Sequence, residues 1–506
     1  MAIFEADFMK LYEQYPVFLT NSLSGEKEKL ETLTPGFVGM YVCGPTVYNY
    51  VHLGNARTFL SFDIIARYLR FLGYKVRYVR NITDVGHLES DADEGEDKIG
   101  KKARLEQLEP MEIVKRYTED FHTVMRQFNI LPPSIEPSAT GHIIEQINIT
   151  KKLLESGLAY EVNGSVYFDV KKYNQSHHYG ILSGRNIEEL MESGRNLDSQ
   201  DEKRDKVDFA LWKKASPQHI MRWPSPWGEG FPGWHIECTV MSTKYLGETF
   251  DIHGGGMDLK FPHHECEIAQ ATGANGKVPV RYWIHGNMLT VNGQKMSKSL
   301  GNSFLPSELF SGNHPLLEKG YSPMTVRFFM LQSHYSSTLD FSNEALNAAE
   351  KGFKKLNNAL SSVKKMTLTK DAANIELEKN LLDQVTRCFV NMSDDFNTAK
   401  TLAVLFEMAT QINTWAAAKE IALTENVFDQ FKSTYIAMME DVLGLKEETG
   451  GNHELLNGTI QVLINLRKKV RADKNFVLSD KIRDDLKAIG IQLKDGKDGE
   501  MGYEIE

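Results

Sequence analysis

Long apolar runs are the first feature that this sequence lacks. No stretch approaches the roughly 18 consecutive apolar residues that a membrane-spanning helix requires, and Glu5 and Asp7 interrupt the apolar residues at the N-terminus. We therefore expect no membrane segment and a cytoplasmic protein. Cysteine is also scarce, with four in 506 residues. So few thiols exclude a disulfide framework and favour metal ligation or simple burial.

A strongly basic composition is missing as well. The chain has 58 Lys and Arg against 68 Asp and Glu, which gives a net charge of −10 and no global sign of nucleic-acid binding. The charge is uneven, however, because residues 461–495 hold nine Lys or Arg against five Asp. A local excess of this kind suits contacts with phosphate groups. The ordinary hydrophobic content, 41%, and the length predict a globular protein of about three or four domains.

A strand, a helix and a second strand are predicted near the start of the chain. Phe37–Val42 has the apolar pattern of a short strand, and a helix is expected to begin near Gly54 and Asn55. Lys75–Ile82 then has the pattern of the next strand. A helix that opens after a strand directs unpaired N–H groups and a positive dipole end outward, so we expect an anion beside His52 and Asn55.

The next segments alternate between folded patterns and polar stretches. Residues 89–97 carry six Asp or Glu in nine positions but lack the EF-hand spacing, so we interpret them as a solvated surface insertion rather than a calcium loop. Residues 160–222 contain one strand pattern and a largely polar stretch, which predicts an inserted segment. A Pro- and Gly-rich loop follows, in which Trp234 stands four residues before Cys238 and is a candidate pocket wall.

Two glycine-flanked segments are candidates for ligand contacts. Thr249–His253 has a strand pattern and runs into three glycines and Asp258, at the end of a strand where open α/β sheets bind ligands. The segment NGQKMSKSLGN, with Lys295 and Lys298, has the composition of a polar loop. Beyond Asn343 the pattern is helical.

Residues of metal-binding type occupy positions that could converge. His263 and Glu267 are four apart, a spacing that places both on one helix face. Cys43 follows a predicted strand and Cys238 opens a predicted helix, and two thiolates, an imidazole and a carboxylate suit zinc. The residues alone leave the choice of ligands open among His263, His264, Glu265, Cys266 and Glu267.

Taken together, these motifs resemble those of the cysteinyl-tRNA synthetases, a class I aminoacyl-tRNA synthetase family, over essentially the whole chain. The family's His-x-Gly-His signature appears as His52–Asn55 and its Lys-Met-Ser-Lys-Ser signature as Lys295–Ser299. The stretches GMYVCGPTVY, PGWHIEC and FDIHGGGMDLKFPHHE add specificity within the class. Asn55 is a departure from the signature, because an amide donates to phosphate but cannot carry the charge of an imidazolium.

The resemblance implies a ligase that activates L-cysteine with ATP and transfers it to the 3′-terminal adenosine of cysteine tRNA. It implies one zinc ion per chain, held by Cys43, Cys238, His263 and Glu267, and magnesium bound with ATP. Catalysis is expected from His52, Asn55, Lys295 and Lys298. ATP contacts are expected at His52, Asn55, Gly256, Asp258 and Lys298. Thr83 and Trp234 are expected to line the amino-acid pocket. Contacts with tRNA are expected at Arg467, Lys468 and Arg471.

The implied fold class is α/β, with a Rossmann-like parallel-sheet catalytic domain that carries an insertion, followed by an α-helical bundle and a small C-terminal anticodon-binding domain. The predicted ranges are 1–159 and 223–285 for the two halves of the catalytic domain, 160–222 for the insertion, 286–343 for the lysine-signature loop and stem-contact region, 344–445 for the bundle and 446–506 for the anticodon-binding domain. We expect a monomer.

Two other functions fit parts of the pattern. A homologous ligase that joins activated cysteine to an amino-sugar, as in mycothiol biosynthesis, would share the zinc and nucleotide motifs but should lack an anticodon-reading tail. A non-catalytic paralogue that binds RNA or zinc would not need an intact His52, Lys295 and Lys298, so these residues favour the enzyme.

Overall fold

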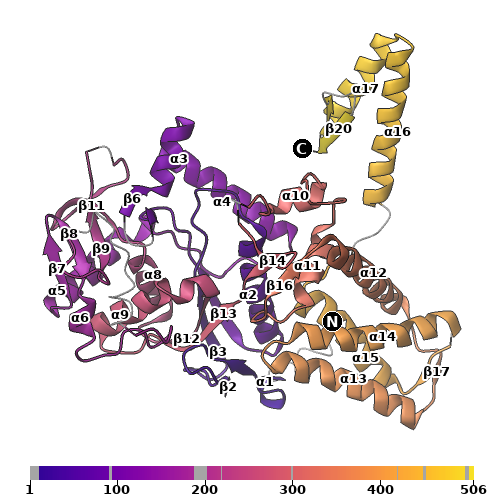
Figure 1. The fold of residues 1–506 in the computed structure, drawn as a ribbon. Helices are drawn as coiled ribbons and strands as arrows, with labels where there is room; N and C mark the ends of the chain where they lie inside the picture. The colour runs from indigo at the N-terminus through magenta and orange to yellow at the C-terminus, as the bar shows by residue number, and fades with distance from the viewer. Residues whose placement is uncertain are drawn as a thin grey trace. The chain divides into compact units, whose positions relative to one another are not determined.

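The chain divides into two units, Met1–Lys446 and Glu447–Glu506 (Figure 1). The computed structural model describes residues 11–90, 94–186, 202–217, 219–297, 300–418, 420–447, 452–495 and 501–505. Within these ranges, every helix is too short or too polar to cross a lipid bilayer.

A four-stranded parallel sheet forms the centre of the first unit. Its order is β13-β12-β3-β4, and the strands are β3 (Phe37–Val42), β4 (Lys75–Arg80), β12 (Phe250–Gly256) and β13 (Val280–Gly286). The chain builds outward from β3 to β4 and later returns to the other side of β3 with β12. The strand order therefore reverses between β3 and β12, which is where open α/β sheets bind ligands beyond the carboxyl ends of their strands.

Helix α2 (Leu53–Phe71) connects β3 to β4, as the sequence predicts (Figure 1). His52 is the N-cap of this helix, and its side chain accepts from the backbone N–H of Asn55. The side chain of Asn55 accepts in turn from the backbone N–H of His52, so the two residues form a capping box. The inward face is fully buried at Phe59, Phe62 and Leu69. This packing fixes the helix start beside the carboxyl edge of the sheet.

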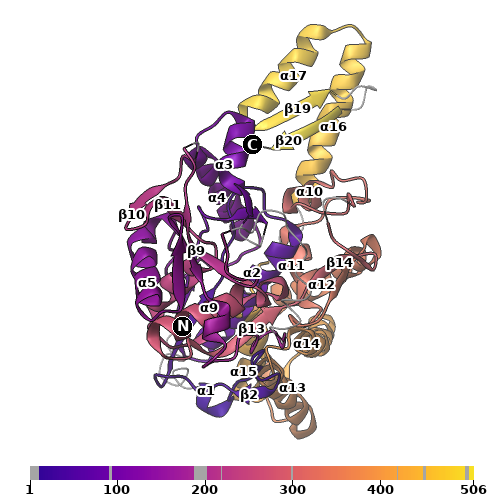
Figure 2. The same cartoon turned by 60° about the vertical axis from the view of Figure 1, so that its left-hand side comes forward.

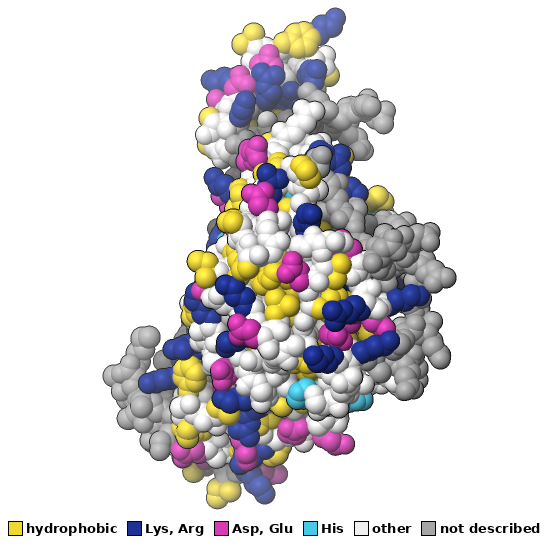
Figure 3. All heavy atoms as spheres, turned by 90° about the vertical axis from the view of Figure 1, so that its left-hand side faces the viewer, with side chains coloured by type: hydrophobic (Ala, Val, Ile, Leu, Met, Phe, Trp, Pro, Cys, Tyr) yellow, Lys and Arg dark blue, Asp and Glu magenta, His cyan; other side chains and the backbone are white. Residues whose placement is uncertain are grey.

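The insertion between the two halves of the sheet contains a second, antiparallel sheet. Its order is β10-β11-β9-β8-β7. The strands are β7 (Ala159–Val162), β8 (Ser165–Phe168), β9 (Phe209–Lys214), β10 (Trp223–Ser225) and β11 (Gly228–Pro232). The predicted loop after residue 222 is therefore wrong, because residues 223–232 form a hairpin of this sheet. Pro224 lies on β10, the edge strand, where not every backbone N–H is needed for pairing. On the face that carries this sheet, basic and acidic side chains are interspersed among apolar ones (Figure 3).

Helices flank the insertion and the second half of the parallel sheet. They are α5 (Ile143–Glu155), α6 (Val170–Tyr173), α8 (Ile236–Leu246), the short turn η3 (Met257–Lys260) and α9 (His263–Asn275). Figure 2 shows α9 next to β13 and α5 beside the antiparallel strands. Helices α8 and α9 lead away from the same sheet edge, which places their first turns close to the end of β3.

The acidic stretch is ordered at both of its ends. β5 (Leu88–Ser90) pairs with β6 (Glu94–Asp97), and α3 (Lys98–Glu106), α4 (Pro110–Gln127) and the turn η2 (Thr140–His142) follow. Asp97 is 2% exposed and accepts from the Gly100 N–H as the N-cap of α3. The interpretation of the whole stretch as solvated is therefore wrong at Asp97. This carboxylate is buried because it caps the first turn of α3 and satisfies a backbone N–H there. Residues 91–93 lie outside the described residues.

A small sheet carries the lysine signature. β14 (Leu289–Val291) pairs antiparallel with β15 (Gln294–Lys295) and parallel with β16 (Leu339–Phe341). Helices α10 (Pro306–Ser311) and α11 (Pro323–Leu331) lie between β15 and β16 in the chain. Lys298 and Ser299 lie outside the described residues.

A helical bundle completes the first unit (Figure 1). It consists of α12 (Asn343–Lys365), α13 (Ile375–Ser393), α14 (Thr398–Ala418), α15 (Glu425–Ala437) and the π-helical turn η4 (Met438–Val442). The helices share one apolar core that includes Leu356, Cys388 and Phe431. Besides the β5–β6 hairpin, two further strand pairs form small sheets of their own. The first follows α1 (Leu11–Gln14) and consists of β1 (Phe18–Thr20) and β2 (Lys27–Lys29); the second consists of β17 (Lys370–Asp371) and β18 (Ala422–Leu423).

The second unit has a small core of its own. It contains α16 (Asn452–Ala472), α17 (Phe476–Ala488), β19 (Ile491–Asp495) and β20 (Met501–Ile505), packed around Ile460, Ile464, Leu486 and Ile491. Lys468 and Arg471 are exposed on α16, whereas Arg467 is 3% exposed. The burial of Arg467 disagrees with its predicted contact with tRNA, which requires an accessible side chain. A long side chain on an amphipathic helix can instead lie along apolar neighbours.

Candidate active site

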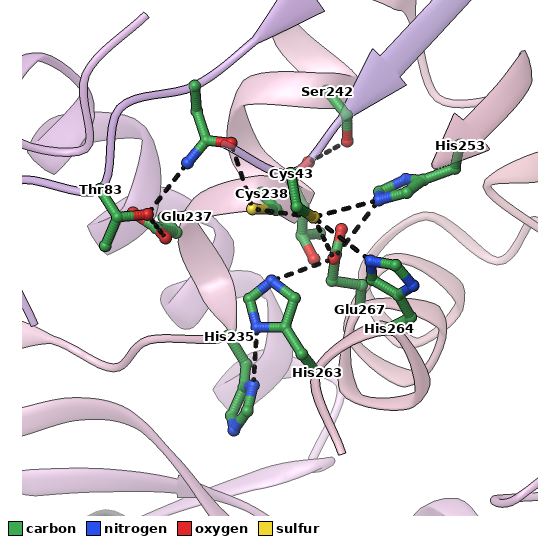
Figure 4. Close-up of polar contacts among 12 residues, drawn as sticks. Cys43, Thr83, His235, Glu237, Cys238, Ser242, His253, His263, His264 and Glu267 are labelled. Carbon is green, nitrogen blue, oxygen red and sulfur yellow. Dashed lines mark hydrogen bonds and ion pairs between the residues drawn. The ribbon is translucent and has the colours of Figure 1, made fainter. Parts of the chain in front are cut away.

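Four side chains of metal-binding type converge at the point where the sheet order reverses (Figure 4). Cys43 directly follows β3, Cys238 lies in the first turn of α8, and His263 and Glu267 lie one turn apart at the start of α9. One donor atom from each lies within 4.8 Å of the others, and all four side chains are buried. These are the four residues that the family resemblance implied as zinc ligands.

The spacing of the donor atoms matches a small tetrahedral ion. Cys43 Sγ lies 3.6 Å from Cys238 Sγ and 3.6 Å from Glu267 Oε1, and His263 Nε2 lies 3.3 Å from Glu267 Oε1. Zinc bonds to sulfur, nitrogen and oxygen imply tetrahedron edges of roughly 3.3 to 3.8 Å. The donor set is also one that zinc prefers, so the residues present fit this ion.

Burial makes the donor set dependent on a cation. It raises the pKa of the Cys43 thiol and of the Glu267 carboxyl well above their ordinary values, raises that of Cys238 to about 12, and lowers that of His263. Buried anionic groups are stable only when a positive charge compensates them. No Lys or Arg among the described residues forms an ion pair with this cluster, so a metal ion is the compensation that fits.

A second set of donors shares two members with the first. His253 and His264, together with Cys43 and Glu267, also each place one donor atom within 4.8 Å of the others. His264 Nε2 lies 3.3 Å from Cys43 Sγ, and its Nδ1 lies 2.8 Å from His285 Nε2. Because the far nitrogen is held by another ring, His264 is oriented to support Cys43 through a hydrogen bond, as residues around metal ligands commonly do.

Cys266, which the sequence left open as a ligand, points elsewhere. Its Sγ lies 3.4 Å from the Tyr179 hydroxyl, within the apolar core that the insertion shares with α8 and α9. Glu265 is likewise engaged by the insertion, because it accepts from the Leu182 and Ser183 N–H groups. Positions 263 and 267 share a helix face and 265 is turned away from it. Cys266 lies at the side of that face, where it contacts Tyr179 of the insertion.

The histidines behind the metal cluster were missed by sequence reasoning. His253 lies on β12 and His285 on β13, and the parallel register pairs Gly255 with His285. His285 Nδ1 lies 2.8 Å from Ser22 Oγ, so polar contacts run from Cys43 through His264 and His285 to Ser22. A usable signal existed, since both strands carry a His-Gly dipeptide toward the carboxyl edge of the sheet.

Thr83 and Trp234 both lie beside the metal cluster. Trp234 packs against the His263 ring at 4.5 Å between centroids and stacks on His87 at 4.3 Å. Thr83 is 2% exposed and donates to Glu237 Oε1 at 2.5 Å. Their predicted role as walls of an amino-acid pocket stays a prediction.

Glu237 and Asn81 also reach this region, and the sequence analysis did not identify them. Asn81 Oδ1 accepts from the Gly44 N–H at 2.8 Å, and its Nδ2 donates to the Thr83 hydroxyl at 3.1 Å. Glu237 Oε2 is buried and has no hydrogen-bond partner among the described residues. These contacts fix the turn after β3 and hence the position of Cys43.

The two class signatures meet at Gly54. A Cβ atom added there would lie 3.1 Å from the His52 ring and 3.2 Å from Met296 Cε. Lys295, next to Met296, is exposed. The structure therefore brings the helix start and the lysine-signature loop together, as expected, while Lys298 lies outside the described residues.

The glycines at the end of β12 let three other elements approach the strand. Added Cβ atoms would lie 2.1 Å from the Phe62 ring at Gly254, 2.8 Å from the His264 ring at Gly255 and 2.3 Å from Asp258 Oδ1 at Gly256. Asp258 is exposed at this edge. An exposed carboxylate beside a bare strand end can accept from a ribose hydroxyl, in line with its predicted role.

Comparison with known proteins gives consistent matches. A family model described as the class I (C) tRNA synthetase catalytic domain matches residues 29–351, and one described as the DALR domain matches residues 390–447. The cysteine–tRNA ligase of Porphyromonas gingivalis is 55% identical over 489 residues, covering 96% of this chain and 99% of that protein. The cysteine–tRNA ligase of Phocaeicola vulgatus is 56% identical over 482 residues, covering 95% and 97%.

A solved structure supports the fold. Mycobacterium tuberculosis methionyl-tRNA synthetase in complex with methionyl-adenylate aligns with a TM-score of 0.56 at 15% identity, covering 80% of this chain and 89% of that chain. This similarity concerns the fold alone. Together with the family matches, it confirms the predicted α/β fold class with a parallel-sheet catalytic domain and C-terminal helices.

Proposed function

Since this chain belongs to the class I tRNA synthetases and, among them, to the cysteine–tRNA ligases, we propose that it activates L-cysteine with ATP and transfers it to the 3′-terminal adenosine of cysteine tRNA. The observation that carries this proposal in the structure is the convergence of the Cys43 donor cluster with the start of α2 at one sheet edge. The donor cluster can thus hold the amino acid, and the start of α2 can hold the nucleotide.

The first step joins the cysteine carboxylate to the α-phosphate of ATP and releases pyrophosphate. Negative charge accumulates on phosphate oxygens in the transition state, so positioned donors and cations provide most of the catalysis. His52 and Asn55 lie at the positive end of α2. Lys295 supplies positive charge from the lysine-signature loop, and Asp258 holds the ribose. Lys298, three residues later in the sequence, is assigned the same charge-stabilising role as Lys295. Magnesium binds with the nucleotide.

The donor cluster serves the choice of amino acid. Bound zinc would ligate the thiolate of the substrate cysteine, a soft interaction that a serine hydroxyl imitates poorly. An apolar pocket alone separates such similar side chains by only about a hundredfold. Cys43, Cys238, His263 and Glu267 hold one ion per chain, while Thr83 and Trp234 enclose the amino acid. In the second step a ribose hydroxyl of the tRNA attacks the adenylate carbonyl and displaces AMP.

The second unit is the proposed anticodon-binding domain. Lys468 and Arg471 are exposed in its basic segment, where they can contact phosphate groups and position RNA. The DALR match ends at residue 447, so it falls on the helical bundle ahead of this unit. We infer a cytoplasmic monomer that acts on ATP, L-cysteine and cysteine tRNA.

Charging of purified cysteine tRNA with labelled cysteine and ATP tests the proposal. Label should appear on the tRNA in an ATP-dependent and zinc-dependent manner, with serine charged far less. If the protein is instead an amino-sugar ligase, the labelled cysteine should be transferred to an amino-sugar acceptor in the absence of tRNA. A non-catalytic paralogue predicts no cysteine-dependent exchange of pyrophosphate into ATP at all.

A further inference from the structure

Arg57 makes an unusual set of contacts close to the class signature. It lies in α2 two residues after Asn55, and it is 3% exposed. Among the residues that the structure describes, its guanidinium donates only to backbone carbonyls: Nη1 to Asn287 at 3.1 Å and Met288 at 2.6 Å, and Nη2 to His334 at 3.3 Å and Ser337 at 2.5 Å. In the part of the chain that the structure describes, no carboxylate forms an ion pair with it.

These carbonyls belong to the two segments that lead into the small sheet. Residues 287–288 connect β13 to β14, and residues 334–337 precede β16. β14 and β16 run parallel, so Arg57 holds both strands at their starts. β14 in turn pairs with β15, where Thr290 lies opposite Lys295. One side chain of α2 therefore sets the position of the strand pair that carries Lys295.

The other end of the lysine-signature loop returns to the same helix. The Leu53 N–H, in the first turn of α2, donates to the Phe304 carbonyl at 3.0 Å. Asn302, 6% exposed, accepts from the Ser297 N–H at 2.8 Å and donates to the Lys295 carbonyl at 3.1 Å. The loop is thus closed on itself by Asn302 and attached to α2 on both sides, through Arg57 at its entrance and Leu53 at its exit.

The chemistry of the contact requires an arginine. A planar guanidinium has five N–H groups in a fixed fork and can serve carbonyls on two segments at once, whereas an ammonium is a compact charge that cannot span them. Burying a guanidinium without a carboxylate is costly, and burial lowers the pKa of Arg57 to about 10. A contact that served only packing would be satisfied by an apolar side chain at lower cost.

We propose that Arg57 is a positioning residue for adenylate formation, which fixes the distance between the His52–Asn55 helix start and the Lys295 loop. The proposal rests on the proposed function of that loop in the first step. Binding of cysteine and zinc depends on other elements, namely the end of β3 and the starts of α8 and α9. Transfer to tRNA takes place after pyrophosphate has left. Arg57 should therefore affect the first step and spare the others.

The test is Arg57→Lys, with Arg70→Lys on the last turn of the same helix as the matched control. We expect the maximal rate of cysteine-dependent ATP–pyrophosphate exchange to fall between about tenfold and a hundredfold, because a displacement of about 1 Å has effects of this size. Zinc content and the Michaelis constant for cysteine should stay unchanged. The enzyme is then loaded to completion with cysteinyl-adenylate in the presence of pyrophosphatase, isolated and mixed with cysteine tRNA. The rate of this single transfer should equal that of the unchanged protein.

Two results would overturn the proposal. Normal exchange in Arg57→Lys would show that the clamp is not needed, and an equal fall in exchange and in transfer would show that Arg57 supports the fold in general. Lys295→Ala, measured in parallel, separates this failure from failure of the proposed function. If Lys295→Ala lowers exchange and Arg57→Lys does not, only the clamp is wrong. If Lys295→Ala leaves exchange unchanged, the assigned function of the loop is wrong as well.

Discussion

Asp63 on α2 and Arg327 on α11 form a fully buried ion pair, with 2.7 Å between Asp63 Oδ2 and Arg327 Nη2, although 264 residues separate them. The same carboxylate oxygen accepts from Arg67 Nε at 2.8 Å. One carboxylate thus compensates two buried guanidinium groups. Backbone carbonyls stabilise Arg327 further, because its guanidinium also donates to the carbonyls of Phe128 and Leu443.

We predict that Asp63→Asn destabilises the first unit by about 3 to 5 kcal/mol, since removing one partner leaves buried cations uncompensated. Thermal unfolding followed by circular dichroism measures the change. Asp383→Asn is the control: its ion pair with Arg387 is exposed and should contribute at most about 1 kcal/mol. Equal melting temperatures for the two variants would contradict the prediction.

The end of the first unit is attached to this ion pair. Arg327 Nε donates to the Leu443 carbonyl at 2.8 Å, and Asn129 Nδ2 donates to the Gly444 carbonyl at 2.8 Å. A chain that ends before these residues would expose the buried cations. A truncation that tests the second unit should therefore end at Lys446, where the first unit ends.

Truncation after Lys446 should separate the two steps of the reaction. Zinc binding and cysteine-dependent pyrophosphate exchange should persist, because all the residues assigned to them lie in the first unit, while charging of cysteine tRNA should fall strongly. Reversal of charge at Lys468 and Arg471 should raise the Michaelis constant for tRNA, most at low salt where screening is weak, and leave exchange unchanged. Unchanged charging after truncation would refute the assignment of the second unit to tRNA.

Cys238→Ser should remove most of the zinc, whereas Cys266→Ser should retain about one zinc per chain. The reason is geometric, because Cys238 Sγ lies in the donor cluster and Cys266 Sγ lies against Tyr179. Both thiols are buried, so the pair of variants controls for a general effect of a polar atom in the core. Elemental analysis of dialysed protein decides between them. Loss of zinc in Cys266→Ser alone would show that the assigned ligand set is wrong.

Zinc affinity should increase with pH across the neutral range. Burial raises the pKa values of the Cys43 and Cys238 thiols above their ordinary values, so both thiols hold protons in the metal-free protein and must lose them on ligation. Competition with a chelator at about pH 6 and about pH 8 should show weaker binding at the lower pH. Proton release on addition of zinc in a weakly buffered solution gives the same sign, and Cys238→Ser should release fewer protons per bound ion. Affinity independent of pH would contradict ligation by thiolates.

Lys298→Ala should lower cysteine-dependent pyrophosphate exchange at least about tenfold without loss of zinc, because its charge acts mainly on the transition state. Lys319→Ala, which removes an exposed lysine paired with Glu350, is the matched control. Both proteins should melt at the same temperature as the unchanged chain. A near-normal exchange rate in Lys298→Ala would remove this residue from the catalytic set.

Local patterns predicted several of the elements and the presence of metal-binding residues near Cys43, Cys238 and residues 263–267. The strand Phe37–Val42 was predicted with its observed bounds, and the helix that follows His52 was predicted within a residue or two, because both have strong apolar periodicity. The i,i+4 spacing of His263 and Glu267 likewise depends only on helix geometry. The family resemblance then selected His263 and Glu267 from the five residues of 263–267 that the pattern alone left open.

Features set by tertiary contacts could not be predicted in this way. The meeting of His264 with His285 depends on the register between parallel strands and on the approach of α9. The four carbonyls around Arg57 come from segments more than 200 residues away in the chain. The hairpin at residues 223–232 was missed because its Gly and Pro residues have the composition of a loop.

The carboxyl edge of the sheet has a consequence for how this sequence can vary. A Cβ atom at Gly44 would lie 1.6 Å from the Asn81 carbonyl oxygen, and one at Gly254 would lie 2.1 Å from the buried Phe62 ring. Every substitution that a single nucleotide change can produce at a glycine codon adds a Cβ atom, so even alanine, the mildest replacement, displaces the turn that holds Cys43 or the core of α2. At Gly44 and Gly254, steric clashes therefore make every amino-acid replacement unfavourable, whatever the chemistry of the new side chain.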